Sequence, residues 1–266
     1  GQRERTVMDD TNQPIGSYCE RVSGGIDPGF WAEPLNAVTN AAFFVAAFIA
    51  WRLAGTLGRR DASVTFLTIN LVAIGIGSTL FHTLSTRWAA AADTIPILIF
   101  ILAYFFVAMR SFVGFSVLGA AVATLVLFAE FIIHATAFNY FLRDVIGGSV
   151  SYFPALMMLG IVGGLLAWHR HPAGLALLAG GGVFAMSLTM RALDVPLCDS
   201  LPTGTHFLWH VLNGVLLGLL LVTLVRRGAG PTLFALVRAR LAGPDAGPGT
   251  GAGQGTGAGQ GTGAAA

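Results

Sequence analysis

The chain has no lysine, only two cysteines and few charged residues, and each of these scarcities excludes a class of protein. Without lysine it forms neither a retinal Schiff base nor a P-loop, because both need that side chain. Two cysteines are too few for a secreted disulfide scaffold or a cysteine metal site. Charged residues make up 11% of the 266 residues and hydrophobic residues 55%, with a mean hydropathy of +0.72. This composition indicates an integral membrane protein rather than a soluble domain.

The formal net charge of +2 is too small to indicate a nucleic-acid partner. Richness in alanine, glycine and arginine favours a bacterial source. Residues 1–31 form a polar extramembrane segment without a continuous apolar run, so we expect no cleavable signal within them.

Seven apolar runs follow, each near the roughly 20 residues that span a bilayer. The sequence therefore predicts an all-α membrane protein, a seven-transmembrane-helix bundle over residues 32–227. Residues 228–266 are rich in glycine and alanine and are predicted to be a disordered C-terminal tail. The predicted spans are 34–53, 64–84, 91–109, 112–134, 150–168, 173–191 and 205–225.

The placement of arginine predicts the orientation, since cytoplasmic loops are enriched in it. Alternate loops and the C-terminal side are rich in arginine, whereas the opposite loops carry only Arg87 and Arg143. We therefore expect the N-terminus outside and the C-terminus in the cytoplasm, in a bacterial inner membrane. The arginines on the predicted cytoplasmic side are Arg52, Arg59, Arg60, Arg110, Arg170, Arg226, Arg227, Arg238 and Arg240.

Five polar residues within the apolar runs form a candidate site. Ser78 and His82 are four residues apart and share a helix face, and Asp93 opens the next run. His206 and His210 have the i, i+4 spacing of metal ligands on a helix. Ionisable groups are costly inside a membrane, so they indicate function. In the predicted orientation all five lie at one depth, in the outer leaflet.

Three neutral imidazoles with one open position are typical of a catalytic zinc site. Zinc lowers the pKa of a bound water to about 7. Asp93 would orient or deprotonate that water, and the Ser78 hydroxyl would stabilise the developing oxyanion. Such a site would hydrolyse an amide or ester of a membrane lipid. The alternative is that the histidines make only hydrogen bonds between helices.

The chain resembles the alkaline ceramidase family, part of a seven-helix hydrolase group that includes the adiponectin and progestin receptors. The resemblance implies a zinc amidase that cleaves the N-acyl bond of ceramide into a sphingoid base and a fatty acid. It makes His82, His206 and His210 the zinc ligands, Asp93 the water-activating group and Ser78 the oxyanion-stabilising group. The matching segments are YCE at 18–20, AEPLNAVTN at 32–40, GIGSTLFHTL at 75–84, DTIP at 93–96 and HFLWH at 206–210.

The resemblance also implies a calcium ion, which prefers oxygen ligands. Tyr18, Glu20 and Glu33 are the expected ligands. Ser17 and Val22 stand where the family has Asp and Asn, and Asp27 is the candidate replacement.

A disulfide is likewise implied, because the family pairs cysteines at the positions of Cys19 and Cys198. The predicted outer location permits such a bond. Two buried thiols are the alternative.

Other polar groups in the spans are expected to serve packing. Glu130 and His134 are predicted to hydrogen-bond between helices, with contact to the site as the alternative. Arg191 and Asp194 are predicted to form a local ion pair, and Asn213 an interhelical hydrogen bond.

Three other functions fit the same pattern. The first is a receptor of the adiponectin-receptor type. The second is a zinc hydrolase of another N-acyl lipid, such as an N-acyl amino acid lipid. The third is a non-catalytic structural or transport protein, which predicts no bound metal.

Overall fold

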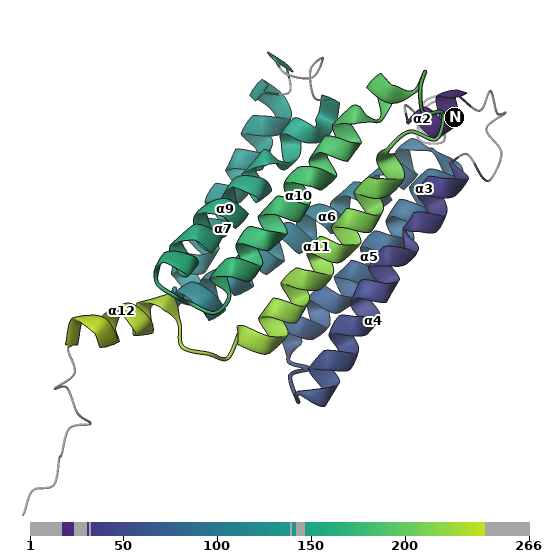
Figure 1. Ribbon diagram of the computed structural model, residues 1–266. Coiled ribbons are helices and arrows are strands. Elements are labelled where there is room, and N and C mark those ends of the chain that lie inside the picture. Colours follow the sequence, from purple (N-terminus) through teal and green to yellow (C-terminus); the bar gives the residue numbers. More distant parts are fainter. Residues whose placement is uncertain (1–17, 24–30, 32, 139, 142–146, 243–266) are drawn as a thin grey trace, which may run out of the picture.

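A computed structural model of the chain describes residues 18–23, 31, 33–138, 140–141 and 147–242. Seven of its helical segments are long and apolar enough to cross a membrane (Figure 1). The predicted seven-helix bundle is confirmed, and the protein is an integral, multi-pass membrane protein. The spans are Pro34–Thr56, Ala62–Leu84, Arg87–Val113, Val117–Phe138, Gly148–Trp168, Gly174–Leu193 and His206–Arg227.

These spans are built mainly from α-helices, with short π and 3-10 turns at three of their ends. A short helix, α2, precedes the first span, and η4 (Val195–Leu197) lies between the last two. The elements are α2 (Cys19–Ser23), α3 (Pro34–Thr39), α4 (Ala41–Thr56), α5 (Ala62–Leu84), α6 (Arg87–Ala108), η1 (Met109–Val113), α7 (Val117–Ile133), η2 (His134–Phe138), η3 (Gly147–Tyr152), α9 (Phe153–Trp168), α10 (Gly174–Leu193), α11 (His206–Arg227) and α12 (Leu233–Ala242).

Local sequence sets several helix ends. The Asp61 carboxylate accepts the Val64 N–H at 2.9 Å and starts α5. The Ser116 hydroxyl accepts the Gly119 N–H at 3.0 Å and starts α7. Such side chains satisfy N–H groups that the first helical turn leaves without partners.

Helix α6 begins earlier than the predicted residue 91. It starts at Arg87, because RWAAAA at 87–92 consists largely of strong helix formers. Asp93 therefore lies in the second turn of α6 and not, as predicted, in its first.

Helices α5 and α11 are the two most deeply buried spans of the bundle, and they contact each other. Helix α5 packs against α4 and α6, and α11 packs against α4, α5 and α10. The end of α5 and the starts of α3 and α11 lie at the same end of the bundle as α2, whereas α12 lies at the opposite end (Figure 1). The predicted site residues thus come from helix ends that meet.

Helices α5 and α6 approach each other closely at Gly77. A methyl group on Gly77 would overlap the Ala92 carbonyl oxygen of α6. Pro96 has no N–H to donate to that carbonyl, so the oxygen is free to face α5. Small residues allow such close contacts between membrane helices. This contact brings Ser78 beside Asp93.

Replacing Gly77 by alanine is expected to lower the thermal unfolding temperature by about 3–10 °C, because overpacking costs about 1–3 kcal/mol. The matched control is Gly164→Ala in α9, where an added methyl group meets no atom within 4 Å. Unfolding would be followed in detergent by circular dichroism. Equal unfolding temperatures for both variants would show that α5 and α6 have room for the methyl group.

The predicted disordered tail over 228–266 is wrong in its first part. Residues Leu233–Ala242 form helix α12, which begins after Pro231. The segment LFALVRARLA contains mostly good helix formers and no glycine. The prediction was wrong because it treated this segment as part of the glycine-rich repeat that follows. Residues 243–266 lie outside the described residues, as do 1–17 and 24–30 of the predicted N-terminal segment.

Candidate metal centre

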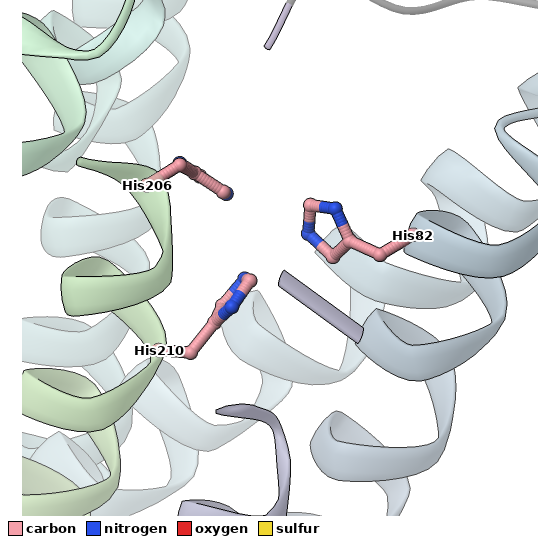
Figure 2. A group of neighbouring side chains, drawn as sticks. All are labelled: His82, His206 and His210. Carbon is pink, nitrogen blue, oxygen red and sulfur yellow. The ribbon is translucent and has the colours of Figure 1, made fainter. Parts of the chain in front are cut away.

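Three histidine side chains converge between α5 and α11. His82 points from the last turn of α5 toward His206 and His210 in the first two turns of α11 (Figure 2). Each ring offers one nitrogen, and these three nitrogens lie within 4.8 Å of one another. All three side chains are at most 2% exposed. The structure thus brings together the three residues that the sequence predicted as metal ligands.

His82 is oriented by a buried carboxylate. Its Nδ1 lies 2.5 Å from Oε2 of Glu33, a residue that is fully buried. The Glu33 N–H also donates to the His82 carbonyl at 3.0 Å, and the Asn36 side chain donates to Oε2 at 3.2 Å. With Nδ1–H donated to the carboxylate, the lone pair of His82 lies on Nε2. This carboxylate–histidine pairing is the usual support of a metal-ligating imidazole.

His210 is oriented by the hydroxyl group of Thr39, 3.1 Å from its Nδ1. That hydroxyl has a single hydrogen, which it donates to the carbonyl of Leu35 or Asn36 at 2.9 or 3.0 Å. When the hydroxyl donates to one of these carbonyls, its oxygen accepts Nδ1–H from His210. The lone pair of this imidazole is then also on Nε2.

His206 is held in place by Asp194 and by Tyr18, the residue just before α2. The Asp194 carboxylate, 1% exposed, accepts the N–H groups of Cys19, Thr205 and His206 at 2.8–2.9 Å. It thereby fixes the first turn of α11. The Tyr18 ring stacks on the His206 ring with 3.6 Å between centroids.

The predicted disulfide between Cys19 and Cys198 is present. It ties α2 to the loop before α11, next to Asp194. Gly204 completes this junction with φ +62°, and any side chain there would collide with Asp194 and Cys19. Glycine meets both requirements because it has no Cβ. The junction keeps His206 in place.

The donor set fits a zinc ion. Nε2 of His82 and Nδ1 of His206 are buried and have no hydrogen-bond partner among the described residues. Buried polar atoms without partners are rare and costly. Three imidazoles are the ligands of many catalytic zinc sites, and those of His82 and His210 have the hydrogen bonds that usually support such ligands.

Replacing Glu33 by glutamine is expected to weaken zinc binding about 10- to 100-fold, the usual effect of losing a supporting carboxylate. Zinc affinity would be measured by competition with a chromophoric chelator. Glu130→Gln, which makes the same change away from the three histidines, is the control and should bind zinc as the wild type does. Wild-type affinity in Glu33→Gln would show that the carboxylate does not orient His82.

Ser78 and Asp93 form a second polar group beside the histidines. Ser78 lies one turn before His82 and is 2% exposed, and its hydroxyl lies close enough to the Asp93 carboxyl group to interact with it. Both residues line one cavity. The remaining lining is mostly apolar and continues along α6 as far as Met109, near the opposite end of the bundle. A polar pair thus opens onto a long apolar space.

The three residues predicted to bind calcium already have protein partners. Both carboxylate oxygens of Glu20 accept N–H groups at the start of α3, at 2.6 and 3.0 Å. The Tyr18 carbonyl accepts the Arg21 N–H at 3.2 Å, and Glu33 contacts His82. Burial raises the pKa of Glu20, and it raises the pKa of Glu33 to about 7. Asp27 and Ser17 lie outside the described residues, and calcium binding stays a prediction.

Two predicted polar contacts differ in the structure. Arg191 does not pair with Asp194, because the Asp194 carboxylate accepts the backbone N–H groups of Cys19, Thr205 and His206. The Arg191 guanidinium donates to the Ser149 hydroxyl at 3.1 Å instead. Glu130 and His134 interact within one helix, at 3.7 Å, and not between helices.

The predicted interhelical hydrogen bond of Asn213 is confirmed. Its side-chain amide donates to the Ser187 hydroxyl of α10 at 3.0 Å. This bond joins α11 to α10 below the site.

The chain matches no protein-family model and no curated protein. Interpretation of the site therefore relies on its own geometry. Sequence reasoning missed two supporting contacts, Glu33 with His82 and Thr39 with His210. Glu33 and Thr39 both belong to the segment AEPLNAVTN at 32–40. Its polar residues at the start of an apolar helix were the signal that could have indicated these contacts.

Proposed function

We propose that the protein is a zinc-dependent intramembrane hydrolase that cleaves the amide bond of an N-acyl lipid, with ceramide as the first substrate to test. The observation that carries the proposal is one arrangement: three buried, converging imidazoles lie beside the Ser78–Asp93 pair, which opens onto a long apolar cavity. With the N-terminus outside, the site would face the outer leaflet of a bacterial inner membrane.

The shape of the cavity supports a lipid substrate. On α6 it is lined by every third or fourth residue from Asp93 to Ala108, which is one face of the helix. This face is about 22 Å long at 1.5 Å per residue. It is polar at one end and apolar over the rest. An acyl chain would occupy the apolar part, leaving the amide group beside Ser78 and Asp93.

The two polar residues have complementary roles in amide hydrolysis. Bound zinc would supply a water molecule acidic enough to attack at neutral pH. Asp93 would accept a proton from the attacking water, and the Ser78 hydroxyl would donate to the oxyanion that forms at the amide carbon. Asp93 would then pass the proton to the leaving nitrogen as the C–N bond breaks. The products are an amine and a fatty acid.

The experiment that tests this function is fatty-acid release by the detergent-purified protein. Ceramide would be offered to a zinc-loaded sample and to a chelator-stripped sample. Release that needs zinc supports the proposal. No release from ceramide or any other N-acyl lipid, with zinc still bound, would contradict it and favour a receptor of the adiponectin-receptor type.

A further inference from the structure

Arg191 is a cation near the site that interacts with the Asp93 carboxylate electrostatically but makes no salt bridge with it. It lies in the last turn of α10, and no salt bridge joins it to a carboxylate of the described residues. Its guanidinium donates to the Ser149 hydroxyl and lies within hydrogen-bonding reach of the Tyr18 hydroxyl. The bond to Ser149 uses one of its five N–H donors and Tyr18 can take a second, which leaves donors for a ligand.

The position of Arg191 connects it to the cavity. Its guanidinium carbon lies 5.7 Å from the centre of the Tyr152 ring and 5.4 Å from that of Trp209. Both rings line the polar end of the cavity, as does Asp93, which is close enough to interact with Arg191 electrostatically. The guanidinium therefore lies just behind the cavity wall, at the end where a lipid headgroup would lie.

A partly buried guanidinium is stabilised by an anion, and its planar shape matches a carboxylate with two parallel hydrogen bonds. Asp93 is the sole carboxylate among the residues lining the cavity, and hydrolysis would need it for the attacking water. A second carboxylate would have to come with the lipid.

We propose that Arg191 binds a lipid carboxylate, which makes the preferred substrate an N-acyl amino acid rather than a neutral ceramide. The acyl chain fills the apolar cavity, the amide lies beside Ser78 and Asp93, and the free carboxylate reaches Arg191. This proposal rests on the proposed function for its substrate. The fatty acid released by hydrolysis is a second source of the same carboxylate chemistry.

The test compares two substrates that differ only in charge, N-oleoylglycine and N-oleoylglycinamide, in a neutral detergent. The wild type is expected to prefer the acid. In Arg191→Gln the ratio of the two kcat/KM values should shift toward the amide by about 10- to 100-fold, mainly through KM, because a charge-assisted hydrogen bond is lost. Arg226→Gln, an exposed arginine at the opposite end of the bundle, is the control and should leave the ratio unchanged.

Inhibition by oleic acid distinguishes the two sources of the carboxylate. If Arg191 binds the headgroup, Arg191→Gln shifts the substrate ratio and leaves the inhibition constant of oleic acid unchanged. If it binds the released fatty acid, that constant rises about tenfold or more and the ratio stays constant. Activity could also fall equally on both substrates, with no change in the substrate ratio or in the inhibition constant. That result would mean that Arg191 only supports Asp93 or Tyr152, and it would overturn the proposal.

A binding measurement separates this proposal from the proposed function. N-Oleoylglycine should raise the unfolding temperature of the wild type more than N-oleoylglycinamide does, and this difference should vanish in Arg191→Gln. If the wild type hydrolyses neither lipid but its unfolding temperature still rises more with N-oleoylglycine, the proposed hydrolase function is contradicted and the carboxylate site is supported. Equal shifts for the two lipids in the wild type would refute the carboxylate site.

Discussion

Replacing His210 by alanine is expected to remove the bound zinc and to abolish hydrolysis. Zinc affinity should fall more than about 100-fold, because loss of even a supporting contact weakens a metal site about 10- to 100-fold. Among the described residues, the cluster has only His82 and His206 as its other members, and neither can replace His210. Zinc per chain would be measured by elemental analysis after gel filtration, and His82→Ala should behave in the same way.

His169→Ala is the matched control for these variants. His169 lies between α9 and α10, at the opposite end of the bundle from the cluster, and its carbonyl accepts a hydrogen bond from Arg240. Removing its imidazole should leave one zinc per chain. Full zinc content and full activity in His210→Ala would show that the cluster is not the metal site.

Replacing Asp93 by asparagine is expected to lower kcat about 10²- to 10⁴-fold while zinc content stays near one per chain, because proton transfer by a positioned group contributes this much. Asparagine keeps the size and shape of the side chain, but it cannot accept the proton. This outcome separates Asp93 from the histidines, whose loss should remove the metal as well.

The control for this change is Asp199→Asn, an exposed carboxylate in the loop before α11. It should retain wild-type kcat. Ser78→Ala should show a smaller loss than Asp93→Asn, since water attack continues without the hydroxyl. An Asp93→Asn variant with wild-type kcat would assign proton transfer to another group.

The fold and the histidine cluster could be predicted because their signals are local. Apolar runs of membrane-spanning length define the seven helices, and the spacing of His206 and His210 places both on one helix face. His82 falls at the same depth once alternate helices are taken as antiparallel. None of these inferences needs the details of packing.

The supporting contacts could not be predicted, because they depend on how distant segments pack. Glu33 and His82 are 49 residues apart in the sequence. Their contact arises because the start of α3 packs against the end of α5. The family resemblance implied that Glu33 is a calcium ligand, whereas in the structure its carboxylate contacts His82.

The partners of Arg191 could not be predicted from the sequence either. A cation three residues from Asp194 suggested an ion pair within one turn. In the structure Asp194 instead accepts N–H groups from Cys19, Thr205 and His206, and its partners come from α2 and α11. Arg191 is thereby left to face the site.

The most direct test of the central claim is a titration of the stripped protein with zinc, in which bound zinc and fatty-acid release are measured on the same samples. We predict that release from an N-acyl lipid rises in proportion to bound zinc and reaches its maximum at one zinc per chain. Full release by the stripped protein, or zinc binding that is unchanged in His82→Ala, would contradict it.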